Sequence, residues 1–156
     1  MKKTDEFFMN KALAQANVAF RHNEVPIGAV IVDAHGIIIA RACNKIESHG
    51  CQIAHAEMLA IQCAAKKIGD WRLNGCRIYV TLEPCLMCMG LIALSRLDTV
   101  VFGATSDLFG SGLSNRDTLP SYAKNLNIVS GVKKEECITL LQAFFKKARK
   151  KEKGKK

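Results

Sequence analysis

The sequence lacks internal repeats, and its only low-complexity stretch lies at the C-terminus. Its longest apolar run covers residues 86–94, which is far too short to cross a bilayer, where about 20 residues are needed. The N-terminus turns acidic at Asp5 and Glu6, where a signal peptide would become apolar. These absences exclude repeat proteins and membrane-spanning proteins, so we expect a soluble protein of the cytoplasm.

A disulfide framework is also absent. The seven cysteines are an odd number without an export signal, so free thiols are expected. Cys63 lies in an apolar helical pattern and Cys76 leads into an apolar strand, which predicts that both are buried. Cys51 lies four residues before His55, and this proximity raises the alternative that it is a fourth metal ligand beside His55.

The net charge of +9 is concentrated at the C-terminus. Residues 146–156 contain eight Lys or Arg and one Glu, whereas residues 1–145 contain 15 basic and 13 acidic residues. We therefore divide the chain of 156 residues into a domain over 1–145 and a basic tail over 146–156. The tail is interpreted either as a solvated, frayed end or as a cationic arm that binds a polyanion such as RNA.

Hydrophobic patterning predicts that helices and strands alternate along the chain. Helical patterns cover residues 5–21, 54–68, 85–95 and a last segment from about 134, and apolar β-branched runs cover 27–32, 36–42, 76–82, 99–103 and a short stretch near 128. Residues 44–53 and 105–121 are expected to be loops. A hairpin followed by alternating helix and strand favours an α/β fold, with a mixed five-stranded sheet covered by helices on both faces.

Two short motifs carry the chemistry: His-Ala-Glu at 55–57 and Pro-Cys-Leu-Met-Cys at 84–88. Zinc prefers four tetrahedral N and S ligands, and catalytic sites take three from the protein and leave the fourth position for water. We therefore predict that His55, Cys85 and Cys88 bind one zinc ion per chain. Glu57 is predicted to carry the proton of the water that zinc activates.

The spacing within each motif supports this division of roles. Cys85 and Cys88 are three residues apart, and Pro84 suits a first helical position, so both sulfurs are expected on one face at a helix N-terminus. The helix dipole lowers the pKa of thiols there. His55 and Glu57 are two residues apart and diverge on a helix, which suits one ligand and one proton carrier. Alone, the Cys-x-x-Cys pair also fits a redox site or half of a structural zinc site.

The two motifs together match the signature of zinc-dependent nucleobase deaminases, and residues 6–150 resemble bacterial tRNA-specific adenosine deaminases of the cytidine/deoxycytidylate deaminase superfamily. The matching residues lie at 24–30, 44, 54–57, 79–85, 87–88, 101–104, 136–137, 140–141 and 144–145. The resemblance implies a three-layer α/β/α fold of the cytidine-deaminase type. It also implies hydrolysis of the wobble adenosine of a tRNA anticodon to inosine, by a homodimer that binds the anticodon stem-loop.

The resemblance assigns two further site residues and has two departures. It implies that Asn44 hydrogen-bonds the flipped base and that the backbone of Ala54 meets the edge of that base. Residues 51–53 are Cys-Gln-Ile where the family commonly has Asp-Pro-Thr, and Ser106 stands where the family usually has an acidic residue. The loop 108–115 lacks the usual Lys-x-Gly pattern, and this region contacts RNA in relatives.

Other functions share parts of this pattern. Cytidine, deoxycytidylate and guanine deaminases carry the same zinc motif, so deamination of a free base or nucleotide is the alternative activity. A non-catalytic zinc module that binds RNA is a third interpretation, against which the presence of Glu57 argues. Of the adjacent Phe144 and Phe145, one is expected in the core and the other exposed, where it would stack on a loop nucleotide.

Overall fold

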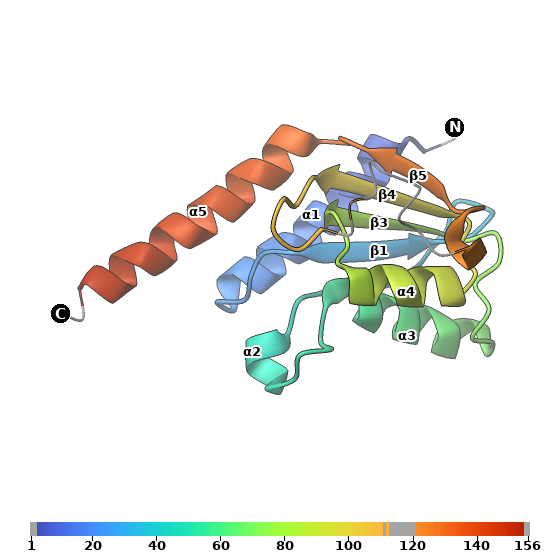
Figure 1. Cartoon of the computed structure of the whole chain (residues 1–156), viewed down its shortest axis with the longest axis horizontal. Helices are drawn as coiled ribbons and strands as arrows, with labels where there is room; N and C mark the ends of the chain where they lie inside the picture. Colours follow the sequence, from blue (N-terminus) through green and yellow to red (C-terminus); the bar gives the residue numbers. More distant parts are fainter. Residues whose placement is uncertain (1–2, 111, 113–120, 155–156) are drawn as a thin grey trace.

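The computed structural model describes residues 3–110, 112 and 121–154 (Figure 1). The strands are β1 (Gly28–Val32), β2 (Ile38–Cys43), β3 (Arg77–Leu82), β4 (Thr99–Ala104) and β5 (Asn127–Ser130). They form one sheet in the order β2-β1-β3-β4-β5. β1 is antiparallel to both β2 and β3, whereas β3, β4 and β5 run parallel. The predicted mixed five-stranded sheet is therefore confirmed.

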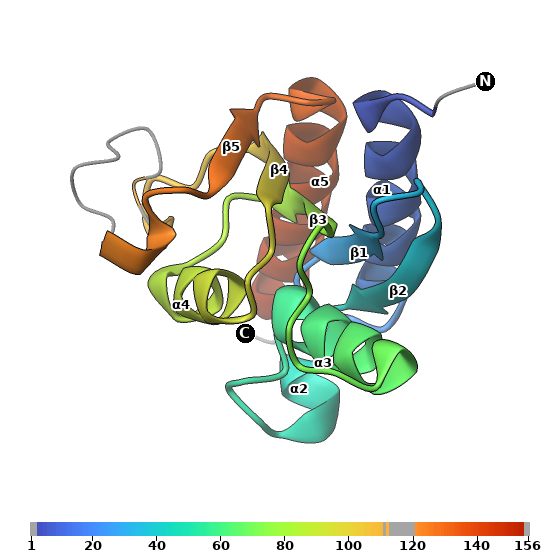
Figure 2. The ribbon, with the colours of Figure 1, turned by 90° about the vertical axis from the view of Figure 1, so that its right-hand side faces the viewer.

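Helices cover both faces of this sheet, as Figure 2 shows. The α-helices of the described residues are α1 (Asp5–Arg21), α2 (Ile46–His49), α3 (Ala56–Ile68), α4 (Leu86–Leu94) and α5 (Lys134–Lys153). One core cluster packs beneath α1 and α5, and the other beneath α3 and α4. This is the three-layer α/β/α architecture that the resemblance implies. Within the described ranges, no helix is long and apolar enough to cross a membrane.

Helix α1 is fixed to the sheet by a hydrogen bond, a ring contact and a close backbone approach. The Asp5 carboxylate accepts a hydrogen bond from the Tyr79 hydroxyl at 2.7 Å, and the ring of Phe8 packs 5.1 Å from that of Tyr79. A Cβ atom at Gly28 would collide with the backbone oxygen of Ala12. Glycine at the start of β1 therefore lets α1 lie directly on the strand.

Two segments that were predicted to be loops have different outcomes. Residues 44–53 include the one-turn helix α2, which polar loop composition did not predict. Of the predicted loop 105–121, residues 111 and 113–120 lie outside the described residues. The described part that follows begins with a short 3-10 helix, η2 (Ser121–Ala123).

Helix α5 is longer than the core requires. Its Phe144 ring packs edge-on against Phe20 of α1, with 5.9 Å between the ring centroids, and the helix then continues past the sheet (Figure 1). The boundary that we placed between residues 145 and 146 falls inside this helix. The basic segment therefore continues α5 as far as Lys153.

Candidate active site

The residues predicted to bind zinc converge at the N-terminal ends of α3 and α4. His55 Nδ1 lies 3.5 Å from Cys88 Sγ and 3.7 Å from Cys85 Sγ, and the three ligand atoms all lie within 4.8 Å of one another. Tetrahedral zinc, with bonds of about 2.0 Å to nitrogen and about 2.3 Å to sulfur, would separate nitrogen and sulfur ligands by about 3.6 Å. The three side chains therefore fit zinc in both donor type and spacing.

Each metal-binding arm begins a helix. His55 and Cys85 have extended backbones and are the N-caps of α3 and α4, and Cys88 follows in the first turn of α4. Cys85 also forms an isolated antiparallel β-bridge with Gly110. The prediction that Pro84 occupies the first helical position is wrong, because the chain stays extended through Cys85. The sulfurs still lie at the positively polarised end of a helix, as predicted.

The two cysteines titrate differently. Hydrogen bonds from Cys88 and His55 lower the pKa of Cys85 to about 4. The hydrogen bond with Cys85 raises the pKa of Cys88, and burial adds to this effect. The thiolate form is therefore favoured at Cys85 and the thiol form at Cys88. A metal ion bound by both sulfurs must displace the Cys88 proton, so metal affinity rises with pH.

Glu57 places a buried carboxyl group beside the cluster. The residue is only 3% exposed, and burial raises the pKa of its carboxyl group to about 7. Among the described residues, Glu57 Oε2 and His55 Nε2 are the buried side-chain polar atoms that lack a hydrogen-bond partner. Burying a polar group without a partner is unfavourable. A carboxyl group with a pKa near neutrality is suited to accept and return a proton.

A cavity of about 640 Å³ includes His55, Cys85 and Glu57 in its wall. The other polar residues of the wall are Asn44, Gln52, Glu83 and Ser106, and the rest of the wall is largely apolar. A volume of several hundred Å³ with a few polar groups is typical of a small-molecule site. The cavity is therefore large enough for a nucleobase that reaches the cluster.

Asn44 is held in one orientation at the edge of this cavity. The residue is 2% exposed, and its Oδ1 accepts a hydrogen bond from Ala56 N at 3.0 Å. Its backbone N–H donates to Ile27 O at 3.1 Å. Because the side-chain oxygen is engaged, the NH₂ group is the end of the amide that can donate to a ligand.

Residues 2–104, which contain the whole cluster, match the family model of the cytidine and deoxycytidylate deaminase zinc-binding region. The chain belongs to this deaminase family. The family and the geometry of the cluster together confirm zinc as the expected cofactor.

Relatives of this deaminase match it over nearly their full length. The tRNA-specific adenosine deaminase of Bacillus subtilis (strain 168) is 49% identical over 152 residues, which cover 96% of this chain and 94% of the relative. The protein of the same name from Aquifex aeolicus (strain VF5) is 41% identical over 145 residues, which cover 92% of this chain and 95% of the relative.

Solved structures share the fold. One, described as part of studies of A-to-I editing by tRNA:A34 deaminases at the wobble position of transfer RNA, has a TM-score of 0.79 and 36% identity. The match covers 85% of this chain and 97% of the chain in that structure. A structure of the guanine deaminase from Nitrosomonas europaea has a TM-score of 0.80 at 23% identity, and covers 90% of this chain and 84% of that chain. At this identity the second likeness shows a common fold.

Ala54, the other base-binding residue implied by the resemblance, is buried next to His55. Its N–H donates to Cys51 O and its carbonyl oxygen accepts from Lys45 N, both at 3.0 Å. A carbonyl oxygen has a second lone pair, whereas a single N–H does not have a second hydrogen. A contact between Ala54 and a base therefore stays a prediction, and it would use the carbonyl oxygen.

The cysteines outside the cluster have mixed outcomes. Cys51 is exposed and lies outside the three-residue metal-binding group found in the described part of the chain, so a fourth protein ligand is not supported. Cys76 is buried as predicted. Cys63 is exposed, contrary to the prediction, because it lies on the outer side of α3.

Sequence reasoning placed a loop after β4 but did not identify which of its residues line the cavity. Leu108 and Phe109 line the cavity, and Glu83 holds their segment by accepting a hydrogen bond from Ser106 N at 3.0 Å. The only feature of the sequence that pointed to this role of Glu83 was its position directly before the Pro-Cys pair. Of the predicted split of the phenylalanine pair, the exposed member is confirmed, since Phe145 lines the cavity and is 44% exposed. Phe144 is only partly buried and packs against Phe20 rather than in either core cluster.

Proposed function

We propose that this deaminase converts the wobble adenosine of a tRNA anticodon to inosine by hydrolysis. The observation that carries the proposal is the buried Glu57 carboxyl group, which lacks a partner at Oε2 and lines the same cavity as His55 and Cys85. Relatives that match nearly the whole chain are named tRNA-specific adenosine deaminase, which supports adenosine in tRNA as the substrate.

The chemistry follows from the arrangement of these groups. Water adds to C6 of adenine, the bond from C6 to the amino nitrogen breaks, and ammonia leaves as inosine forms. His55, Cys85 and Cys88 would hold zinc, whose charge would lower the pKa of a water molecule toward neutrality. Glu57, with a carboxyl pKa of about 7, takes a proton from the attacking water and delivers it to the leaving amino group. The Asn44 NH₂ group donates to an acceptor nitrogen of the base and keeps C6 within reach.

The alternative substrate is a free base or nucleotide. The rim of the cavity favours RNA, because Leu86 is 73% exposed, Leu108 82% and Phe109 72%. A free base inside the cavity would leave these apolar side chains in water. A single-stranded loop covers more of the rim, and its bases are splayed into a pocket at little unstacking cost.

Helix α5 adds a cationic surface that suits the anticodon stem-loop. One shallow depression on it is lined by Ala143, Lys146, Lys147, Lys150 and Lys151. The helix is docked on α1, since Lys147 Nζ lies 5.3 Å from the centre of the Phe20 ring and Lys151 Nζ donates to Asn23 Oδ1 at 3.4 Å. Phosphates are bound by such clusters with release of counterions. The basic segment is therefore proposed as an RNA contact rather than a solvated end.

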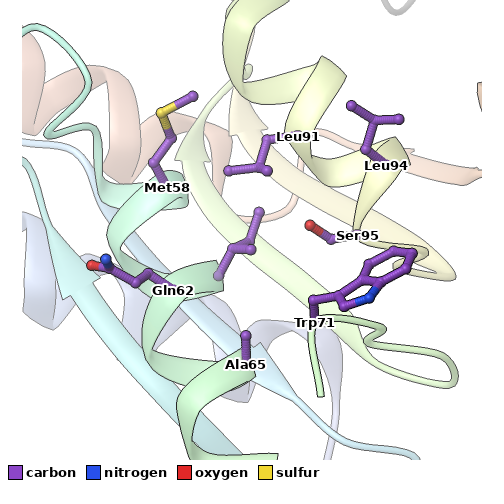
Figure 3. Close-up of a pocket in the computed structure, with 8 residues that line it drawn as sticks. Met58, Gln62, Ala65, Trp71, Leu91, Leu94 and Ser95 are labelled. Carbon is purple, nitrogen blue, oxygen red and sulfur yellow. The ribbon is translucent and has the colours of Figure 1, made fainter. Parts of the chain in front are cut away.

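The homodimer implied by the resemblance is proposed to form through the groove between α3 and α4, which Figure 3 shows. The groove has a volume of about 370 Å³, and its walls include Met58 and Gln62 of α3, Leu91 and Leu94 of α4, and Trp71. Trp71 is 53% exposed and Leu94 is 59% exposed in the single chain. Exposed apolar surface of this kind is typical of a protein interface.

An inosine assay tests the function directly. The zinc-loaded protein is incubated with an anticodon stem-loop and, separately, with free adenosine, guanine and cytidine. Inosine formed in the stem-loop, without conversion of the free compounds, supports the proposal. Conversion of a free compound without conversion of the RNA would favour the alternative. RNA binding without any product would favour the non-catalytic module. Because tRNA is used in the cytoplasm, a cytoplasmic location is part of the proposal.

A further inference from the structure

A tight turn over residues 106–110, called here the rim turn, closes one side of the cavity. Gly110 N donates to Ser106 O at 3.0 Å, and Phe109 N donates to Ser106 Oγ at 3.3 Å. Ser106 N donates in turn to Glu83 Oε2 at 3.0 Å. The rim turn is therefore hydrogen-bonded internally and tied to the residue that follows β3.

Gly110 allows the rim turn to approach the metal-binding arm. It forms the isolated β-bridge with Cys85, and a Cβ atom at this position would collide with Ser106 O and with the Glu83 carboxylate. The close approach therefore requires glycine on steric grounds. It fixes the backbone of the rim turn next to a ligand of the cluster.

The rim turn presents apolar side chains to solvent at the edge of the cavity. Leu108 and Phe109 are 82% and 72% exposed and line the same cavity as Glu57. The turn contains no Lys or Arg, and its one charged residue is the exposed Asp107, which disfavours a phosphate at this position. Cations stand next to other parts of the wall: Lys146 and Lys147 follow Phe145 on α5, and Lys45 lies between Asn44 and Ile46. The apolar rim turn and the cationic surfaces are thus supplied by different segments.

We propose that Phe109 stacks on the nucleobase next to the target adenosine. The inference rests on the proposed function, because it needs a polynucleotide whose target base enters the cavity. Unstacked bases of single-stranded RNA bind to exposed aromatic rings, and Phe109 is an exposed ring on a turn fixed beside the cluster. Phe109 then acts as a positioning residue that favours a polynucleotide over free adenosine, while the phosphates face the lysines of α5.

Variants of Phe109 test this role. Phe109→Ala is expected to lower kcat/KM for the anticodon stem-loop by about tenfold or more, the order of effect found when one stacked base loses its ring partner. Phe109→Trp keeps an aromatic face and is expected to retain most activity. Ile37→Ala is the matched control, because Ile37 is also exposed (57%) but lies in the turn between β1 and β2, at the far end of β1 from Gly28 and the cavity wall.

Abasic substrates separate stacking from a structural effect. An abasic nucleotide on one side of the target is expected to reduce kcat/KM of the wild type by a factor similar to that of Phe109→Ala. The same abasic substrate is expected to reduce kcat/KM of Phe109→Ala little further. 2-Aminopurine at that position is expected to be quenched by the wild type and less by Phe109→Ala. The inference alone would be overturned if Phe109→Ala lowered kcat/KM equally on the intact stem-loop and on each abasic stem-loop. It would also be overturned if Phe109→Ala lowered kcat/KM on none of them. A wild type that forms no inosine in the stem-loop would overturn the proposed function, and this inference with it.

Discussion

Asn44 Oδ1 accepts a hydrogen bond from Ala56 N across 3.0 Å, and Ala56 lies between His55 and Glu57 in the chain. One end of the amide therefore holds the start of α3, which carries both the metal-binding imidazole and the proton carrier. The other end is available to the cavity that Asn44 lines. In the proposed function, a single side chain thus joins the placement of the catalytic groups to the recognition of the base.

Two substitutions of Asn44 separate these roles. Asn44→Asp keeps an acceptor for Ala56 N and removes the NH₂ donors, so it is expected to keep the fold and zinc but lose kcat/KM. Asn44→Ala also leaves the Ala56 N–H without a partner, which is expected to cost about 1–3 kcal/mol of stability. Thermal unfolding and inosine formation measure the two effects. Full activity of Asn44→Asp would show that Asn44 does not donate to the base.

Glu57→Gln is expected to keep zinc and RNA binding and to lose turnover. A positioned proton carrier contributes about 10²–10⁴-fold to the rate, and an amide cannot replace it. Glu135→Gln, which removes an exposed carboxylate from α5, is the matched control. Rates are measured as inosine formed, beside metal analysis of each protein. Loss of zinc from Glu57→Gln would instead make Glu57 a ligand.

The metal content of three proteins checks the ligand set. We expect one zinc per chain in the wild type and in Cys51→Ser, because Cys51 lies outside the cluster. His55→Ala is expected to lose the metal, since two protein ligands hold zinc poorly where three are needed. Elemental analysis after dialysis measures this. Full zinc in His55→Ala, or its loss from Cys51→Ser, would contradict the assignment.

Charge removal on α5 tests whether this helix binds RNA. Because the basic segment continues the helix, point substitutions are preferable to truncation of residues 146–156. Lys146→Gln with Lys150→Gln is expected to weaken binding of the stem-loop, and to flatten the slope of log K against log salt by about 0.7–0.9 for each phosphate that is no longer bound. Lys66→Gln with Lys67→Gln removes the same charge at the end of α3. Equal slopes for both double variants would mean that the α5 lysines are only solvated.

A charge placed in the groove tests the dimer. Leu94→Glu introduces a carboxylate on an exposed position, where it would be buried without a partner in the proposed interface. We expect light scattering to show a dimer for the wild type and a monomer for this variant, with zinc retained in both. Ile37→Glu adds the same charge outside the groove. A dimeric Leu94→Glu protein would place the interface elsewhere.

The cluster and the sheet were predictable from sequence because their signals are local. Runs of β-branched residues predict the strands. The three-residue spacing of Cys85 and Cys88 predicts that their two sulfurs lie near each other. The pairing of these sulfurs with His55, which lies 30 residues before Cys85 and 33 before Cys88, came from the recognised combination of motifs. Periodicity alone does not bring the two arms together.

The features that escaped prediction depend on interactions between distant segments. Cys85 stays extended, rather than starting a helix after Pro84, because its backbone bridges to Gly110. The rim turn is held by Glu83, which lies 23 residues before Ser106. Gly110 and Glu83 leave no sign in the local sequence pattern of the segments that they hold. Composition therefore indicated only a loop over the rim turn.

The metal cluster joins two helices, because His55 precedes α3 whereas Cys85 and Cys88 belong to the start of α4. A bound ion therefore works as a cross-link, and by mass action it stabilises the arrangement that binds it. The same two helices form the walls of the apolar groove. We expect chelation to loosen this pair of helices and to weaken the proposed dimer, so that the supply of metal would set its assembly together with its catalytic competence.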